Sequence, residues 1–478
     1  MTTSSSAYFA SVAGQWDELR RGYFGPEVRE AAIAKAYLRP EMAAADIGAG
    51  TGFISEALAP LVRRVYAVDA SAEMLETARR NLAAFTNIEY HHAEGERLPF
   101  PDESLDAVFA NMYLHHTADP LAAIREMARV LRPGGRLVIT DMDAHEHAWL
   151  KEEMADVWLG FPRGQVRAWF EEAGLVNVVV DCTGQSCCAA PAEAERDEAR
   201  ISVFVASATR RIPRRSEVRR DYAAAAEGKP LCGCAPAQES AASGCCGAGA
   251  SDEGSCCGGS KYEAFQFDKG YSAAELAAAP QEAAEIALGC GNPLALAGLR
   301  PGEVVLDIGS GGGLDAFLAA QAVGERGRVI GVDMTPEMLQ RARQAAERGG
   351  FTNVEFRQGY AEALPAAEGE ADVVISNCVI NLAEDKGLVF REAYRVLKPG
   401  GRLEVSDMVT SGALPFELVM DEEGWSECIT GALPEQEYLD LAAQAGFGGM
   451  RVRRSASMGE IAGVAVYSVI LSARKELS

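Results

Sequence analysis

The chain has 478 residues, and 45 Lys and Arg against 69 Asp and Glu give it a net charge of −24. So acidic a chain repels a nucleic-acid backbone unless one face is locally basic, and we find no such face, so we expect no nucleic-acid partner. The apolar runs are short, none reaches the roughly 18 residues that a membrane span needs, and the first residues form no basic leader. We therefore expect a cytoplasmic protein with no membrane partner.

One unit occurs twice along the chain. The matched segments are AADIGAGTGF (44–53) with VLDIGSGGGL (305–314), VYAVDASAEML (65–75) with VIGVDMTPEML (329–339), and VLRPGGRLVITDM (130–142) with VLKPGGRLEVSDM (396–408). The offset between matched residues stays between 261 and 266. A nearly constant offset of that size indicates a duplicated domain, whereas a solenoid repeats every 20 to 50 residues or so.

Within each copy, short β-rich runs alternate with Ala-, Leu-, Arg- and Glu-rich segments at helical spacing. This alternation predicts an α/β fold with a mostly parallel sheet covered on both faces. Two strand-like stretches close each copy, which favours an antiparallel strand at the sheet edge. We expect an N-terminal domain over 1–208, a flexible Cys-, Gly-, Ala- and Ser-rich linker over 209–262, and a C-terminal domain over 263–478.

A glycine-rich loop follows the first strand of each copy. Its pattern is D-x-G-x-G-x-G, not the G-x-G-x-x-G of dinucleotide sites, and a second acid ends the next strand. That acid can accept two ribose hydroxyls, and an acid beside the loop suits a ligand that carries a cation and no pyrophosphate, such as S-adenosylmethionine (SAM). The alternative is a structural turn in a domain without ligand. The expected SAM contacts are Asp46, Gly48, Gly50, Gly52 and Asp69 in the first copy, and Asp307, Gly309, Gly311, Gly313, Asp333, Met334 and Asn377 in the second.

With the VL[RK]PGGRL segment included, both copies resemble class I SAM-dependent methyltransferases over nearly their whole length. The resemblance implies two tandem Rossmann-like domains.

The second copy contains no histidine, although an oxygen or carbon methyl acceptor usually needs a general base, most often His. Cys378 follows a strand whose end should face the ligand crevice, and Cys290 and Cys428 can fold over the same crevice. A lone cysteine is most often a small buried apolar residue, but three converging thiols suit a soft ion. Trivalent arsenic bound by three sulfurs keeps a lone pair that can attack a methyl group without a base.

Specific segments of the second copy resemble the bacterial arsenite methyltransferase family from about Val218 onward. They are GYSAAELAAAP, ALGCGNPLALAGL, VLDIGSGGG, VIGVDMTPEML, VEFRQGYAEALP, VVISNCVINL and ECITGAL. The resemblance implies methyl transfer from SAM to arsenite, with Cys290, Cys378 and Cys428 as arsenic ligands. It also implies a relay thiol at Cys256 or Cys257, and a disulfide that thioredoxin or glutathione reduces. The chain departs from the family by further cysteines ahead of that pair, which leaves the identity of the relay thiol open.

The first copy offers other chemistry. His115, His116 and His145 follow strands whose ends face the crevice, so they are candidate bases, with a structural or substrate-shaping role as the alternative. We expect Cys182, Cys187 and Cys188 in the loop between the last two strands. The segments WDELRRGYFG, EMADVWLGF and FEEAGL resemble methyltransferase domains fused to arsenic-type repressors, which fixes no substrate.

Two functions follow as hypotheses. In the first, the chain is an arsenic-detoxifying enzyme whose N-terminal domain is a second methyltransferase or a degenerate partner. In the second, it is a thiol-rich metalloid-binding or sensing protein that binds SAM without turnover. The intact glycine loops and the three separated cysteines favour the enzyme, while only the linker cysteine cluster favours the sensor.

Overall fold

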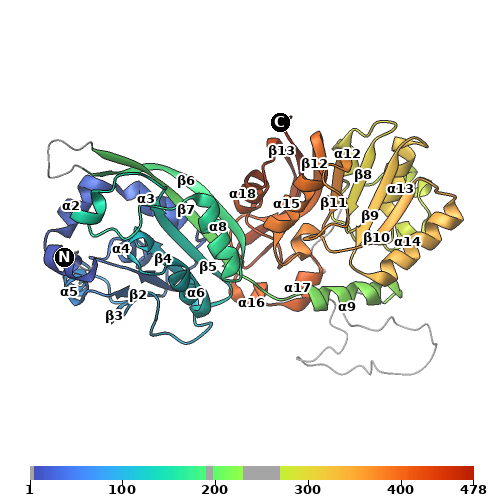
Figure 1. The fold of residues 1–478 in the computed structure, drawn as a ribbon. Helices are drawn as coiled ribbons and strands as arrows, with labels where there is room; N and C mark the ends of the chain where they lie inside the picture. Colours follow the sequence, from blue (N-terminus) through green and yellow to red (C-terminus); the bar gives the residue numbers. More distant parts are fainter. Residues whose placement is uncertain (1–4, 190–197, 230–269, 478) are drawn as a thin grey trace, which may run out of the picture. The chain divides into compact units, whose positions relative to one another are not determined.

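A computed structural model describes residues 5–189, 198–229 and 270–477. The chain forms two compact units, Met1–Ile212 and Pro213–Ser478, each with its own sheet (Figure 1). Cys256 and Cys257, the candidate relay thiols, lie outside the described residues.

The first unit alternates strands and helices as expected. Its strands are β1 (Ala43–Ile47), β2 (Arg64–Asp69), β3 (Ile88–His92), β4 (Leu105–Asn111), β5 (Leu131–Met142), β6 (Leu175–Ala189) and β7 (Ala199–Arg210). Its helices are α1 (Ser5–Val12), α2 (Trp16–Tyr23), α3 (Pro26–Ala34), α4 (Phe53–Leu58), α5 (Ala72–Asn81), α6 (Pro120–Val130), α7 (Leu150–Glu153) and α8 (Arg163–Glu172), with a 3₁₀ turn, η1 (Leu114–His116).

The second unit repeats this order. Its strands are β8 (Val304–Ile308), β9 (Arg328–Asp333), β10 (Val354–Gln358), β11 (Ala371–Asn377), β12 (Leu397–Thr410), β13 (Gly448–Ile461) and β14 (Val464–Arg474). Its helices are α9 (Arg215–Ala226), α10 (Ala273–Ala278), α11 (Gln281–Glu285), α12 (Leu294–Ala297), α13 (Leu314–Val323), α14 (Pro336–Gly349), α15 (Lys386–Val396), α16 (Phe416–Val419), α17 (Glu422–Ser426) and α18 (Glu435–Gln444), with a 3₁₀ turn, η2 (Ile380–Leu382).

The two sheets have the same topology. The strand orders are β3-β2-β1-β4-β5-β7-β6 and β10-β9-β8-β11-β12-β14-β13, and all pairings among the first five strands of each sheet are parallel. The mostly parallel sheet with an antiparallel strand at one end is confirmed. That strand, β7 or β14, pairs antiparallel on both sides, so β6 or β13 is the outermost strand.

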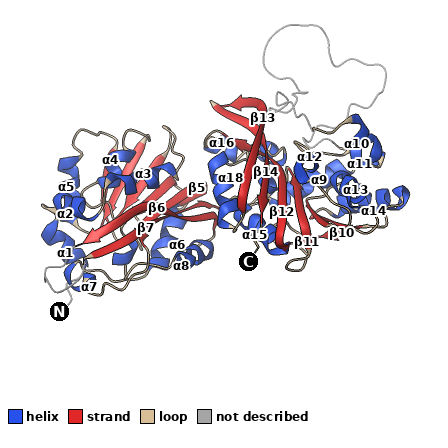
Figure 2. Cartoon of the chain, turned by 90° about the horizontal axis from the view of Figure 1, so that it is seen from above, coloured by secondary structure: helices blue, strands red, loops and turns tan. Residues whose placement is uncertain are grey.

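Helices cover both faces of each sheet (Figure 2), and the burial of β1 shows why they must. In β1, Ala45 and Ile47 join the core cluster that includes Phe170 of α8, while Ala44 joins the opposite cluster with Leu58 of α4. Successive strand residues point to opposite faces, and a strand whose every residue is buried must be covered twice. β1 meets this condition along its whole length.

The segment 209–262, which we expected to be linker, contains a helix of the second unit. Helix α9 buries Val218, Ala225 and Ala226, and the two alanines pack with Met338 of α14. The helix forms there because its apolar residues recur at helical spacing and find an apolar surface to cover. The N-terminus of α9 is also held in place, because the carboxylate of Glu384 accepts hydrogen bonds from the backbone N–H groups of Arg214 and Arg215, both at 2.9 Å.

The loop that we expected to carry Cys182, Cys187 and Cys188 is instead the end of strand β6. Cys182 pairs with Phe204 and Cys187 with Ile201 of β7, and only Cys187 is buried. A long hairpin with alternating exposure therefore holds these thiols. Among the described helices, none combines the length and the apolar character needed to cross a bilayer.

Candidate functional site

A pocket lies at the carboxyl ends of the parallel strands in the second unit. It has about 1100 Å³ of empty volume, including space that opens to solvent. The ends of β8, β9 and β11 supply its floor, and residues of α9 and of the segment around α11 supply its walls. Ligands of open parallel sheets bind at this edge. Six of the seven SAM contacts expected in the second copy line the pocket; the seventh, Gly313, caps α13 and lies between the lining residues Gly312 and Leu314.

The glycine loop passes close to neighbouring groups. Gly309 has φ +71°, and a Cβ there would lie 2.2 Å from a methyl carbon of Val379. Gly311 donates its N–H to the Asp333 carboxylate at 3.0 Å, and Thr335 donates to the same carboxylate at 2.8 Å. Glycine is needed where the backbone is left-handed and where no side chain fits. The loop is thus held open toward the pocket.

Three buried carboxylates face this loop. Burial, with the nearby Asp315 and Asp333, raises the pKa of Asp307 well above its usual range. Burial raises the pKa of Asp315 to about 6, although Tyr271 and Asn377 donate hydrogen bonds to it. One oxygen of Asp307 is buried without a hydrogen-bond partner. An unpartnered buried carboxylate oxygen is costly, so these groups form a site that a cationic ligand would stabilise.

The three cysteines of the second copy come together. Cys290 and Cys378 form a disulfide, with their Cα atoms 5.8 Å apart. The buried Cys428 thiol donates to the carbonyl oxygen of Cys378 at 2.8 Å. Cys378 lines the pocket and has φ +60°, which turns the chain sharply after β11. Burial raises the pKa of Cys428 well above its usual range.

Asn377 connects the cofactor side of the pocket to the thiol side. Its amide nitrogen lies 2.7 Å from the carbonyl of Gly291 and 3.1 Å from Asp315, and its oxygen accepts the N–H of Cys290 at 3.1 Å. Since Asn377 is the last residue of β11, the segment that carries Cys290 is fixed to the sheet end.

Several residues that the sequence did not single out take part in this site. Tyr222 of α9 lines the pocket and donates to the Ser426 carbonyl at 3.3 Å, two residues before Cys428. An oxygen of the buried Asp407 and the sulfurs of Cys290 and Cys378 all lie within 4.8 Å of one another. Burial raises the pKa of Asp407 to about 7. Asp407 was detectable in the sequence, because it repeats Asp141 of the first copy.

The equivalent loop of the first unit is arranged differently. The acid at the end of β2 is used as in the second copy: the two carboxylate oxygens of Asp69 accept the N–H groups of Gly50 and Ser71, both at 2.8 Å. Asp46, however, is satisfied within the fold by the N–H and hydroxyl of Ser55 at 2.9 and 2.7 Å. Gly48 and Gly52 have positive φ, as their counterparts do. The two copies share the geometry of the loop. They differ in the acid before it, because Asp307 has a buried oxygen without a hydrogen-bond partner and Asp46 does not.

The candidate bases of the first unit separate into two groups. His115 and His116 lie in η1, directly after β4, and are close to Asp156 and Asp141. His145 is not part of this group and accepts the N–H of His147 at 3.3 Å, and burial lowers its pKa to about 4. Only the first group forms a cluster of possible ligands.

Comparison with known proteins agrees with this organisation. Family models described as methyltransferase domains match residues 45–139 and 299–446. An arsenite methyltransferase of Halobacterium salinarum is 48% identical over 178 residues, which are 37% of this chain and 45% of that protein. One of Aquipseudomonas alcaligenes is 49% identical over 166 residues, 33% of this chain and 47% of that protein.

The chain thus spans about half the length of the curated relatives that it matches. A solved structure, of an arsenic (III) S-adenosylmethionine methyltransferase from Chlamydomonas reinhardtii, is 37% identical and matches 42% of this chain and 72% of that one, with a TM-score of 0.38.

Proposed function

Starting from a chain with two methyltransferase domains and homology to arsenite methyltransferases over part of its length, we propose that the second unit transfers methyl groups from SAM to trivalent arsenic. The observation that carries this proposal is the convergence of Cys290, Cys378 and Cys428 beside a pocket with an acidic glycine loop. No acceptor is proposed for the first unit.

Two features of the pocket suit SAM: the unpartnered carboxylate oxygen of Asp307 and the glycine-rich loop, which leaves room beside the backbone. Asp307 and Asp315 would hold the ammonium group of the amino acid end, and Asp333, beside Gly311, would accept the ribose hydroxyls. When bound, SAM supplies a methyl group on a sulfonium, which is a strong electrophile. Tyr222 and Met338 also line the pocket, and their apolar surfaces would exclude water around the bound ligand.

Arsenite would enter as the trihydroxide after the disulfide has been opened. Reduction of the Cys290–Cys378 bond consumes two electrons and two protons from an external dithiol. Each of the three thiols then replaces one hydroxide, and its proton leaves with that hydroxide as water. The raised pKa of Cys428 is no obstacle, because the departing hydroxide removes the proton.

Methyl transfer then needs no base from the protein. The lone pair of the thiol-bound arsenic forms the As–C bond while the methyl–sulfonium bond breaks and its electron pair stays on sulfur. Arsenic is formally oxidised by two electrons in this step. Two of the cysteine sulfurs can return those electrons by leaving as a disulfide, while a water molecule takes their place on arsenic and releases one proton. Thioredoxin or glutathione would reduce that disulfide, with Cys256 or Cys257 as the expected relay.

The test is arsenic speciation after incubation of the purified full-length protein with arsenite, SAM and a dithiol. We expect methylated arsenic from the wild type. We expect Cys378→Ser to lower the yield by at least about a hundredfold, since it removes one sulfur ligand, while SAM still binds.

Cys182→Ser is the matched control, because it removes an exposed thiol of the first unit. Turnover retained by Cys378→Ser would remove Cys378 from the proposed role. A folded wild type that binds both arsenite and SAM but yields no methylated arsenic would favour the metalloid-binding or sensing alternative.

A further inference from the structure

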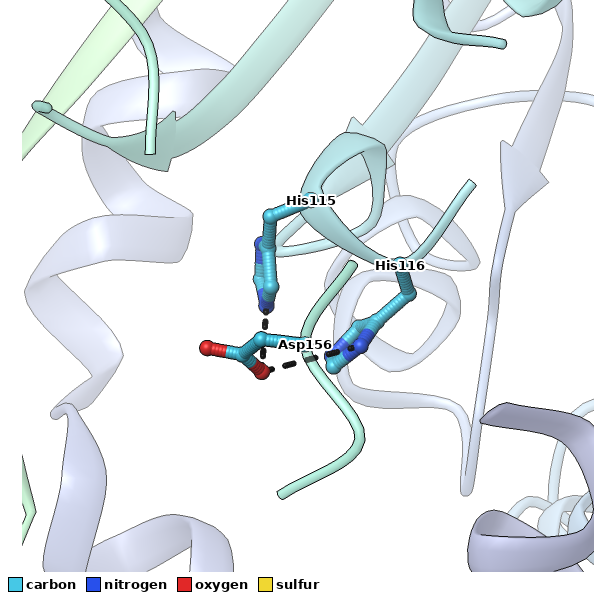
Figure 3. A group of neighbouring side chains, drawn as sticks. All are labelled: His115, His116 and Asp156. Atoms are coloured by element: carbon cyan, nitrogen blue, oxygen red, sulfur yellow. Dashed lines mark ion pairs between the residues drawn. The ribbon is translucent and has the colours of Figure 1, made fainter. Parts of the chain in front are cut away.

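The first unit contains a second cluster of ligand-type side chains. His115, His116 and Asp156 each offer one ligand atom, and these atoms all lie within 4.8 Å of one another (Figure 3). Nε2 of His115 and Nδ1 of His116 both lie 3.8 Å from the same oxygen of Asp156. All three side chains are nearly inaccessible, with exposures of 5%, 11% and 2%.

These separations are too long for hydrogen bonds but suit ligands of one ion. Bonds from zinc to imidazole nitrogen and carboxylate oxygen are about 2.0 to 2.2 Å, so two ligands at a tetrahedral angle are about 3.4 Å apart. Among the described residues, no hydrogen bond reaches the carboxylate of Asp156. Nδ1 of His116 has only a long contact of 3.4 Å with the Ala155 carbonyl, which a bound ion would replace.

The surroundings orient the cluster as the outer shell of a metal site would. Nδ1 of His115 lies 2.7 Å from a carboxylate oxygen of the fully buried Asp141, so that Nε2 is the atom directed at Asp156. Carboxylates that accept the other N–H of a histidine ligand fix its tautomer and its ring orientation. Two neutral imidazoles, two carboxylates and one divalent cation also sum to zero charge, which favours a buried site.

Backbone contacts hold the loop of Asp156 against the histidines. The N–H groups of Val157 and Trp158 both donate to the His115 carbonyl, at 2.9 and 3.0 Å. Phe9 packs edge-on against the His116 ring, with 4.8 Å between the ring centroids. The three ligand atoms are therefore set by tertiary contacts from three separate segments.

The second unit lacks this cluster at the repeated positions. The segment NMYLHH at 111–116 matches NCVINL at 377–382, so Asn381 and Leu382 stand where the first copy has histidines. Asp407 still accepts the backbone N–H of Asn381 at 3.2 Å, as Asp141 does from His115 at 3.3 Å. The backbone contact is common to the fold, whereas the imidazoles are an addition that the fold does not require.

From this geometry we propose that His115, His116 and Asp156 bind one divalent transition-metal ion, best matched by Zn²⁺, with Asp141 as a positioning residue. Three protein ligands leave a fourth position open, as in zinc sites that bind water or a substrate.

The test uses Co²⁺ as a spectroscopic probe and full-length protein. The twelve cysteines are a competing set of ligands, so the protein is reduced, alkylated with iodoacetamide and freed of metal before titration. We expect the wild type to bind one equivalent of Co²⁺ with visible d–d bands and no sulfur-to-cobalt charge-transfer band, and Zn²⁺ to displace it. We expect His116→Ala and Asp156→Asn to weaken binding more than about a hundredfold, and Asp141→Asn to weaken it by roughly 10- to 100-fold.

His92→Ala is the matched control, because it removes an imidazole from the outer strand β3 and should leave the affinity unchanged. A second readout is the melting temperature, which Zn²⁺ should raise in the wild type but not in Asp156→Asn, a variant of the same size. Absence of the sulfur-free Co²⁺ spectrum in the wild type would overturn the proposal. So would wild-type affinity in folded His116→Ala and Asp156→Asn proteins.

Discussion

At the residue scale, the two copies differ at equivalent positions after the fourth strand of each sheet. Cys378 follows β11 with φ +60°, and its counterpart Met112 follows β4 with φ +50°. Each donates its N–H to the neighbouring strand at 2.8 Å, to the carbonyls of Ser406 and Thr140. The same turn therefore places a cysteine sulfur in one unit and a methionine thioether in the other, and the proposed arsenic chemistry is assigned to the unit that has the cysteine.

Asp315 provides a pH test of the proposed SAM site. Its pKa in the folded protein is raised to about 6, chiefly by burial, so it is ionised above that pH and neutral below it. A neutral carboxyl no longer attracts a cation. We expect the affinity of the second unit for SAM to fall roughly tenfold between about pH 7 and pH 5, since one pKa unit corresponds to a factor of ten.

Calorimetric titration of SAM at each pH measures this effect. Asp315→Asn keeps an acceptor for the Tyr271 hydroxyl but cannot titrate, so its affinity should be lower and less dependent on pH. The pKa of Asp307 is also raised, which leaves some residual slope. An identical slope in the wild type and the variant would show that Asp315 does not contribute.

At the element scale, two glycines of the β8–α13 loop allow two costs of an alanine substitution to be measured separately: the collision of its Cβ with a neighbour and the strain of its backbone. Gly309 and Gly311 have φ values of +71° and +50°, but only at Gly309 would a Cβ collide with Val379. A left-handed alanine costs about 1 to 2 kcal/mol, and overpacking costs about 1 to 3 kcal/mol more. We expect Gly311→Ala to lower the free energy of unfolding by the backbone cost alone. We expect Gly309→Ala to lower it by the backbone cost and the overpacking cost together.

Urea denaturation and SAM titration of both variants test this expectation. Gly309→Ala should also lose SAM affinity, because the displaced Val379 lines the pocket. Equal destabilisation by the two substitutions would mean that the loop relaxes away from Val379 at no cost.

Helix α9 shows how an element that precedes the sheet completes a site. It packs against α14 as α1 packs against the equivalent α5 of the first unit, and its Tyr222 lines the pocket and reaches the segment before Cys428. Arg215 of the same helix pairs with Glu362 at 3.1 Å on the pocket wall. The pocket is therefore a product of the sheet and of a helix that precedes it by about 80 residues.

At the scale of the whole molecule, the boundary between the units falls before α9. Each unit has its own core, so we expect residues 213–478 produced alone to fold, to bind SAM and to methylate arsenite at the rate of the full chain. We expect residues 230–478 to lose SAM affinity at least about tenfold, because the removal of α9 uncovers Met338 and opens the pocket wall.

The pair of truncated proteins is compared by circular dichroism, SAM titration and arsenic speciation. A full rate in residues 213–478 would establish that the first unit is separable. Full SAM affinity in residues 230–478 would contradict the role given to α9, whereas loss of activity in both would mean that the second unit depends on the first.

Most of the fold was predictable from the sequence. The repeated D-x-G-x-G-x-G loops and the repeated PGG segments predicted two copies of one parallel α/β fold, because helix and strand periodicities are local properties of the chain. The prediction for Cys182, Cys187 and Cys188 was wrong, since a β-hairpin that continues past the sheet has the same local composition as a loop. The role of α9 was missed because its apolar face is short, and only its packing against α14 shows that the helix belongs to the second unit.

The sequence by itself determined which chemical groups each copy possesses: thiols without histidine in the second, and paired histidines in the first. Only the tertiary structure decided which of these groups meet. Cys290 and Cys378 are 88 residues apart in the chain and are bonded, while Asp156 joins His115 from a separate loop. Contacts of this kind depend on where strand ends and loops converge, and sequence periodicity contains no information on that convergence.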